Sequence, residues 1–354
     1  MTFVRLVLLS SLLTGSAAAQ ELRFAELGDF KLGSGEVIRE CRIGYRTFGQ
    51  LDKDRSNAIL FPTWANGTTE QLRSAVGPGG SLGLSGYFVI AVEALGNGVS
   101  SSPSNSRLQP RMKFPKFTIR DMVESQHELL ARALHIDHLK AVMGTSMGGM
   151  QTFQWMVSYP DFMDAAIPIV GSPRLAPYDL MHWQAQIDAI VNDRGWQDGE
   201  YSESPARAAE VEFGAILLRT PEYYNEHTTR QQVFEQLRNA RTSAIGVDAN
   251  NKLRQVQAMM GLDVSEGFGG SMDAAAAVVK ARVLVIVSRT DHVVTPGPAL
   301  DFARRLHAET LELDDNCGHL APNCEETKVA SAVRRFLERP AGVSSSPTRE
   351  SRPR

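Results

Sequence analysis

This sequence of 354 residues has few cysteines and few aromatic residues, and it has no large excess of charge of either sign. The three cysteines, Cys41, Cys317 and Cys324, do not have the spacing of zinc ligands, so we expect no metal site. The formal net charge is −3, and the 37 lysines and arginines are scattered along the chain. The sequence has no basic stripe that could neutralise phosphates, and we therefore expect no nucleic-acid partner.

Long apolar runs are also missing beyond the N-terminal segment. Residues 1–19 contain a single arginine, an apolar run over 6–13 and three consecutive alanines at their end. This order predicts a secretory signal peptide cleaved after Ala19, because the apolar run is too short to cross a bilayer. A buried N-terminal helix is the alternative, although no helix cap precedes the run. We expect an exported protein, periplasmic or secreted, with no membrane contact after cleavage.

Export would place the cysteines in an oxidising compartment. Cys317 and Cys324 are close in sequence and lie on either side of His319, so they are candidates for a disulfide. Such a bond would close a small loop around the histidine and restrict its motion. Two buried free thiols are the alternative.

Apolar residues make up 43% of the chain and charged residues 22%, which is enough apolar material for one large domain. Residues 118–136 carry apolar side chains at three- and four-residue steps, as in an amphipathic helix. Short apolar segments alternate with such helices and predict an α/β fold, with a mostly parallel sheet covered by helices on both faces. The predicted strands are residues 37–49, 57–62, 87–92, 140–145, 165–170, 282–287 and 310–314.

One long block breaks this alternation. Residues 173–275 contain several segments with helical periodicity and no convincing strand. Insertions in parallel sheets lie over the carboxyl ends of the strands, where ligands bind. We interpret the block as a helical lid between two parts of the core, residues 20–172 and 276–338. Residues 339–354 are rich in Ser, Pro and Arg without periodic apolar residues, which predicts a disordered tail.

Two serines stand at the centre of a Gly-x-Ser-x-Gly pattern. Ser81 lies in the glycine-rich stretch "VGPGGSLGLSG" with no strand before it, which is typical of a flexible turn. Ser146 follows the predicted strand 140–145 and precedes the apolar segment "MGGMQTFQWM", which suits a buried helix. Strand, sharp turn and helix form the context of a nucleophile elbow, so we expect Ser146 to be the nucleophile. A serine that only caps the helix is the alternative.

A serine hydroxyl becomes reactive when a histidine accepts its proton and a carboxylate orients that histidine. Asp291 lies on the loop after one late strand, and His319 lies on the loop after the next. This is the chain order expected for the partners of an elbow serine. His292 competes as the base, and Asp314 and Asp315 are the alternative acids.

Attack by the serine on a carbonyl would produce an oxyanion that needs two N–H donors. We expect one donor from the backbone of Met147, the residue after the proposed nucleophile, at the N-terminus of the predicted helix. The second donor is expected from the loop 63–67, which follows an early strand, and its position favours Ala65. Trp64 and Asn66 are the alternatives in that loop.

Three stretches carry a resemblance to a known family: "RIGYRTFGQLDKDRSNAILFPTWANGT", "GTSMGGMQTFQWMVSYPD" and "VDANNKL". They resemble the homoserine O-acetyltransferase branch of the α/β-hydrolase superfamily, and the resemblance covers most of residues 22–338. It implies an eight-stranded core, a helical lid and a Ser/Asp/His triad at Ser146, Asp291 and His319. We expect no cofactor.

The chain departs from this family where a substrate would be recognised. "TWANG" replaces the common His-Ala-Leu-Thr-Gly of the oxyanion loop, and "GHLAP" replaces Gly-His-Asp-Ala-Phe around the histidine. "QAQIDAI" lacks the lid arginine that the family matches to an amino-acid carboxylate. Together with the export signal, these departures favour an exported esterase that hydrolyses a small carboxylic ester through an acyl-enzyme.

Two other functions remain open at this point. One is an acyltransferase that moves an acetyl group from acetyl-coenzyme A to homoserine or another small alcohol, and the other is a non-catalytic binding protein on the same fold. In each enzyme hypothesis the partner is a small-molecule ester or acyl donor. A homodimer formed through the lid is a further expectation.

Overall fold

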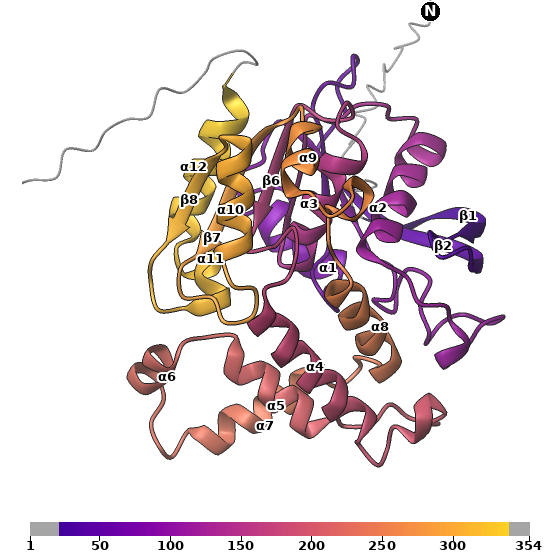
Figure 1. The fold of residues 1–354 in the computed structure, drawn as a ribbon, viewed down its shortest axis with the longest axis vertical. Coiled ribbons are helices and arrows are strands. Elements are labelled where there is room, and N and C mark those ends of the chain that lie inside the picture. Colours follow the sequence, from indigo (N-terminus) through magenta and orange to yellow (C-terminus); the bar gives the residue numbers. More distant parts are fainter. Residues whose placement is uncertain (1–20, 340–354) are drawn as a thin grey trace, which may run out of the picture.

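A single mixed sheet forms the centre of the computed structural model, which describes residues 21–339 (Figure 1). Its eight strands have the order β1-β2-β4-β3-β5-β6-β7-β8. Pairing is antiparallel between β1 and β2 and between β2 and β4, and it is parallel across the rest of the sheet. The mostly parallel eight-stranded sheet expected from the sequence is thereby confirmed. The strands are β1 (Arg23–Lys31), β2 (Val37–Phe48), β3 (Ala58–Pro62), β4 (Phe88–Val92), β5 (Ala141–Thr145), β6 (Ala165–Ile169), β7 (Arg282–Ser288) and β8 (Glu309–Leu313).

The strand β1 is the one that the sequence analysis missed. Its sequence "RFAELGDFK" mixes buried apolar residues with exposed charged ones, and its pairing with β2 is irregular around Gly28. Gly28 has a φ of 73°. A strand at the edge of a sheet needs only one apolar face, so β1 lacks the continuous apolar run by which the central strands were predicted.

Helices pack on both faces of the sheet. Phe153 and Phe302 belong to the apolar cluster under α2, α3 and α10, and Leu72 and Phe336 belong to the cluster under α1 and α12. The helix predicted over 118–136 consists of α2 and a π-helical continuation. The helices of the core are α1 (Thr69–Val76), α2 (Ile119–Glu128), α3 (Met147–Ser158), α9 (Met272–Ala277), α10 (Gly297–Leu306), α11 (Ala321–Cys324) and α12 (Glu326–Glu338).

Five helices lie together below the sheet in Figure 1, between β6 and β7 in the chain. We call these helices, α4 to α8, the lid. They fall within the predicted block 173–275, but α9, at the end of that block, packs against α10 in the core. The helices of the lid are α4 (Pro177–Val191), α5 (Ala208–Leu217), α6 (Pro221–His227), α7 (Val233–Ser243) and α8 (Ala249–Met260).

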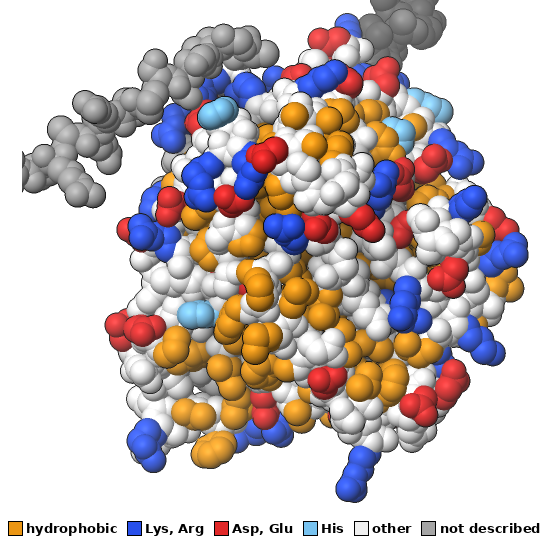
Figure 2. Space-filling model, in the orientation of Figure 1, with side chains coloured by type: hydrophobic (Ala, Val, Ile, Leu, Met, Phe, Trp, Pro, Cys, Tyr) orange, Lys and Arg blue, Asp and Glu red, His pale blue; other side chains and the backbone are white. Residues whose placement is uncertain are grey.

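Large apolar side chains are exposed on the lid, where Figure 2 shows them in the lower half of the molecule. The predicted homodimer through the lid would bury these side chains, and it stays a prediction. The exposed side chains on the lid are Tyr178, Leu180, Met181, Ile216, Val233, Phe234 and Ile245.

No helix within residues 21–339 has the length and apolar character to cross a membrane. The predicted signal peptide, residues 1–19, and residues 340–354 of the predicted tail lie outside the described residues.

Candidate active site

Ser146 stands at a sharp turn between β5 and α3. Its backbone has a φ of 58° and a ψ of −120°, which is a strained conformation for a residue with a side chain. A Cβ at Gly144 would lie 2.6 Å from the backbone of Gly148, and a Cβ at Gly148 would lie 2.6 Å from the carbonyl oxygen of Pro62. Only glycine fits at these two positions, so strand and helix approach closely on either side of the serine, as expected for a nucleophile elbow.

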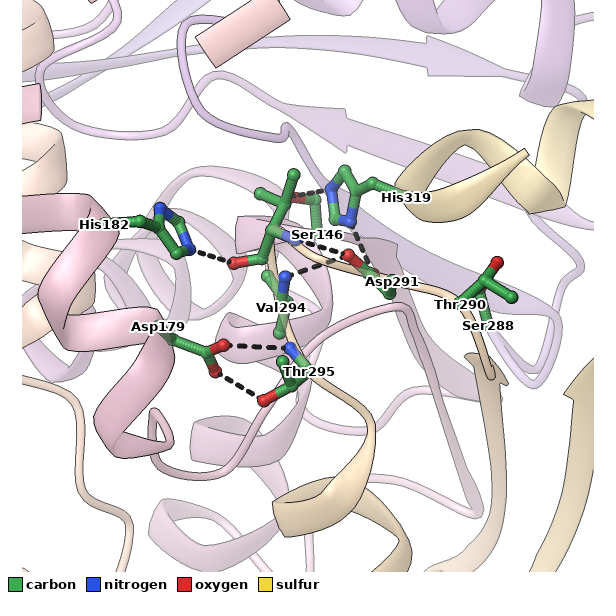
Figure 3. Close-up of polar contacts among 10 residues, drawn as sticks. Ser146, Asp179, His182, Ser288, Thr290, Asp291, Val294, Thr295 and His319 are labelled. Carbon is green, nitrogen blue, oxygen red and sulfur yellow. Dashed lines mark hydrogen bonds and ion pairs between the residues drawn. The ribbon is translucent and has the colours of Figure 1, made fainter. Parts of the chain in front are cut away.

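The three residues predicted as a triad meet beside this turn (Figure 3). Nε2 of His319 lies 2.9 Å from Oγ of Ser146, and Nδ1 lies 2.7 Å from Oδ2 of Asp291. Oδ1 of Asp291 accepts hydrogen bonds from the backbone N–H groups of Val293 (2.8 Å) and Val294 (3.0 Å). A carboxylate only accepts hydrogen bonds, so Nδ1 of His319 carries the proton and Nε2 is left to accept one from the hydroxyl. The arrangement can therefore transfer a proton from Ser146 to the imidazole.

The alternative residues that the sequence left open lie outside this group. Ser81 is in a turn after α1, and its backbone N–H donates to the carbonyl oxygen of Ser74. Asp314 is exposed, with an ion pair of 3.6 Å to Lys328, and Asp315 accepts a hydrogen bond within its own loop. Among the described residues, no hydrogen bond joins any of them, or His292, to the hydroxyl or the imidazole.

Met147, the first predicted oxyanion donor, begins α3 directly after the serine. The first N–H groups of a helix have no partner within the helix and carry its partial positive charge. No hydrogen bond among the described residues uses the N–H of Met147. This N–H is therefore free to donate to an oxyanion that forms at Ser146.

The second predicted donor belongs to the loop 63–67 after β3. The backbone N–H of Asn66 donates to Oε1 of Gln255 on α8 (2.7 Å), so Asn66 is occupied. The N–H groups of Trp64 and Ala65 have no hydrogen-bond partner among residues 21–339. The structure therefore leaves the predicted donor Ala65, and its neighbour Trp64, as candidates for the second donor.

A buried carboxylate that the sequence analysis missed anchors the far end of this loop. Oε1 of Glu93, at the end of β4, accepts from the N–H (2.9 Å) and the hydroxyl (2.6 Å) of Thr69. Asn97 uses its Nδ2 to donate both to Oε2 of Glu93 (2.6 Å) and to the carbonyl oxygen of Gly67 (3.0 Å). Burial raises the pKa of Glu93, and the hydrogen bonds from Thr69 and Asn97 oppose the rise.

The fold agrees with that of known proteins. Residues 79–322 match the model of the α/β hydrolase fold. The chain belongs to the α/β-hydrolase family. It is 33% identical to an ethyl acetate hydrolase from Pseudomonas veronii, over 83% of this chain and 88% of that one.

The solved structures that resemble this α/β hydrolase include enzymes with two different activities. It is similar to an acetylester hydrolase from Corynebacterium glutamicum, with a TM-score of 0.84, 29% identity and 90% and 96% of the two chains covered. It is also similar to a homoserine O-acetyltransferase from Bacillus anthracis, with a TM-score of 0.83, 25% identity and coverages of 90% and 98%. The resemblance inferred from the sequence is confirmed. This α/β hydrolase is a serine hydrolase or acyltransferase that acts by ester hydrolysis or acyl transfer.

The lid supports the loop that carries the acid of this α/β hydrolase. Asp179 on α4 accepts hydrogen bonds from the backbone (3.2 Å) and hydroxyl (3.1 Å) of Thr295 (Figure 3). Nε2 of His182, one turn further along α4, lies 2.9 Å from the carbonyl oxygen of Val293. Burial lowers the pKa of His182 and so favours its neutral imidazole, and the hydrogen bond to Val293 opposes this shift. The loop around Asp291 is therefore held from the lid side as well as from the sheet.

The histidine loop of the α/β hydrolase is held by a disulfide. Cys317 and Cys324 are bonded, with Cα atoms 6.6 Å apart, and His319 lies within the loop that they close. Nη1 of Arg219, between α5 and α6 of the lid, lies 3.1 Å from Sγ of Cys317. The next lid residue, Thr220, donates through its hydroxyl to the carbonyl oxygen of Asn316, the residue before Cys317 (2.7 Å). The loop is thus restrained by a covalent bond and by the lid.

The structure offers little to bind a metal. Within residues 21–339, the one group of side chains close enough to share an ion consists of Asp315, Cys317 and Cys324. Both sulfur atoms of that group are in the disulfide. A bonded sulfur is not a thiolate, so this group does not provide the ligands that a transition metal requires.

Reduction of the disulfide is expected to lower the free energy of unfolding by about 2–3 kcal/mol, because opening so short a loop returns chain entropy to the unfolded state. The kcat for ester hydrolysis should also fall, since His319 gains freedom to leave the hydroxyl. Urea unfolding and ester hydrolysis, each with and without reductant, measure the two effects. Cys317→Ser should not respond to reductant, whereas Cys41→Ser should respond like the wild type. Free thiols at both positions in fully active protein, found by mass spectrometry of non-reduced peptides, would contradict the prediction.

Proposed function

We propose that this α/β hydrolase is an exported carboxylesterase that hydrolyses small carboxylic esters through an acyl-enzyme on Ser146. The observation that carries the proposal is the continuous hydrogen-bonded path from the hydroxyl of Ser146 through His319 to Asp291. A buried histidine that faces a strained, glycine-flanked serine on one side and a doubly hydrogen-bonded carboxylate on the other is suited to nucleophilic catalysis.

The first half of the reaction forms the acyl-enzyme. Oγ of Ser146 attacks the ester carbonyl carbon while Nε2 of His319 accepts the hydroxyl proton. Asp291 keeps the imidazole in the required tautomer and stabilises the imidazolium. The carbonyl oxygen becomes an oxyanion that accepts hydrogen bonds from Met147 N–H and from the loop 63–67. The carbon–oxygen bond to the alcohol then breaks, and the imidazolium gives its proton to the departing alkoxide.

The second half releases the acid. Water attacks the acyl carbon, and Nε2 of His319 accepts one of its protons as a second oxyanion forms in the same place. The bond between the acyl carbon and Oγ of Ser146 breaks, and the imidazolium returns the proton to the serine. The carboxylic acid leaves, and the enzyme is restored.

The charges of the lid support hydrolysis of an uncharged ester over transfer to an amino acid. Helix α4, with the sequence "PYDLMHWQAQIDAIV", contains no lysine or arginine that could bind an amino-acid carboxylate. Two cations of the lid with little exposure, Arg207 and Lys252, both pair with Glu210, at 2.7 Å and 3.5 Å. A third buried cation of the lid, Arg254, donates to the backbone carbonyl oxygens of Met112 and Phe114. These three cations are already engaged within the protein, and a small uncharged ester needs none.

Export is supported by the signal-like residues 1–19 and by the disulfide, since disulfides persist in oxidising compartments. N-terminal sequencing of protein recovered outside the cytoplasm should begin at Gln20. An N-terminus at Met1 in that fraction would refute the proposed cleavage.

The proposed function is tested by offering the purified protein both kinds of substrate. We expect release of nitrophenolate from short-chain nitrophenyl esters, with an initial burst if deacylation is slower than acylation. Acetyl-coenzyme A with homoserine should give no acetylhomoserine. Product that depends on homoserine and forms faster than hydrolysis would favour the acyltransferase. Absence of both turnover and labelling by a fluorophosphonate would favour a binding protein.

A further inference from the structure

One side chain of the lid reaches the oxyanion loop. Gln255 lies on α8, the lid helix next to the core in Figure 1, and it is completely buried. Its Oε1 accepts from the backbone N–H of Asn66 (2.7 Å), and its Nε2 donates to the carbonyl oxygen of Leu95 (2.9 Å). A Cβ at Gly96 would lie 3.2 Å from Cγ of Gln255, so the amide fits closely against the chain after β4. Gln255 therefore joins the loops that follow the neighbouring parallel strands β3 and β4.

The two ends of the oxyanion loop are held without the lid. The N–H of Thr63 donates to Val92, and its hydroxyl accepts from the N–H of Ala94, each at 3.0 Å. At the other end, Asn97 donates to the carbonyl oxygen of Gly67. The middle of the loop, with the candidate donors Trp64 and Ala65, is a turn closed by a hydrogen bond from the N–H of Gly67 to the carbonyl oxygen of Trp64 (2.9 Å). The residue after Ala65 is also bonded to the lid.

Asn66 is the residue through which this restraint acts. It has a φ of 56°, in the left-handed region that asparagine adopts more readily than other residues with a side chain. The bond from its N–H to Gln255 fixes the peptide plane that joins Ala65 to Asn66. This plane is connected to the N–H of Ala65 through the φ and ψ rotations of Ala65. Holding the plane therefore limits how the N–H of Ala65 can turn.

We propose that Gln255 is a positioning residue that sets the second oxyanion donor from the lid, without touching the substrate. The inference rests on the proposed function, because it concerns the oxyanion of the same acyl transfer. Loss of the amide would let the middle of the loop relax, and the donor would then miss the position where charge develops. Donor groups of this kind stabilise the transition state more than the bound substrate, so the effect belongs in kcat and not in KM.

The test compares Gln255→Met with Gln257→Met, a matched change two residues along the same helix. We expect kcat per active site of Gln255→Met to fall about 10- to 100-fold, somewhat less than complete loss of one oxyanion donor, with KM changed less than about twofold. The inhibition constant of a trifluoromethyl ketone, which forms a tetrahedral adduct with a serine, should rise by a similar factor. Gln257→Met should resemble the wild type in both measurements.

Titration of active sites with a fluorophosphonate separates positioning from folding. If Gln255 were only structural, Gln255→Met would contain fewer titratable sites, but kcat per site and the inhibition constant would be unchanged, and that result would overturn the inference. A wild-type protein that neither hydrolyses esters nor reacts with the fluorophosphonate would instead refute the proposed function itself.

Discussion

Ser146→Ala is expected to abolish ester hydrolysis, with a loss in kcat of about 10⁶-fold, and to abolish labelling by a fluorophosphonate. Without Oγ no acyl-enzyme can form, and the imidazole of His319 has no hydroxyl to activate. The fold should persist, because alanine has the same Cβ as serine and meets the positive φ of 58° at a similar cost. Steady-state hydrolysis of a nitrophenyl ester, gel-based labelling and a thermal unfolding curve measure the three outcomes.

Ser81→Ala is the matched control for this experiment, because it changes the serine of the other Gly-x-Ser-x-Gly pattern. Its activity and labelling should equal those of the wild type. Labelling that survives in Ser146→Ala and disappears in Ser81→Ala would overturn the proposed mechanism.

Asp291→Asn should lower kcat by about 10⁴-fold at neutral pH while the protein remains folded. The amide oxygen can still accept from the backbone N–H groups of Val293 and Val294, which Oδ1 of Asp291 now accepts. The amide nitrogen would then face Nδ1 of His319 as a donor, which favours the tautomer with the proton on Nε2. With its proton already in place, Nε2 of His319 could no longer accept the proton of Ser146.

The control for the acid is Asp314→Asn, since Asp314 is exposed and follows β8 in the sequence, where an alternative acid was considered. It should leave kcat within about twofold of the wild type, as expected for an exposed residue whose ion pair contributes little. A loss of less than tenfold in Asp291→Asn, or a large loss in Asp314→Asn, would show that the acid is misassigned.

Sequence alone was sufficient to select the residues that the structure brings together at Ser146. Asp291 follows the buried strand β7 and His319 follows the edge strand β8, both in the parallel part of the sheet, and the carboxyl ends of parallel strands share one edge. The short apolar strands in the sequence therefore predict that the loops after them lie together at one edge of the sheet, without knowledge of any side-chain contact. The same reasoning gives the loop 63–67 but not its conformation, which is why Ala65 and Trp64 are both left as donors.

The side chains that support the site could not be found in this way. Gln255 and Asn66 are 189 positions apart. Asn66 was considered only as an alternative donor in its own loop, and no local pattern links it to Gln255. Glu93 directly follows the predicted strand 87–92, but its partner Thr69 begins a helix that the sequence analysis did not identify. Buried polar side chains are satisfied by whichever group the tertiary fold brings near, so their pairing is a property of the folded chain and not of a segment.

The loop that the disulfide closes around His319 makes the activity of this enzyme depend on how the protein is prepared. In a recombinant host whose cytoplasm is reducing, the sheet and helices would form while Cys317 and Cys324 stayed as thiols. Batches from different expression routes would then differ in specific activity although their sequences and folds are the same. Counting free thiols in each batch before assay would separate that source of variation from true differences in substrate preference.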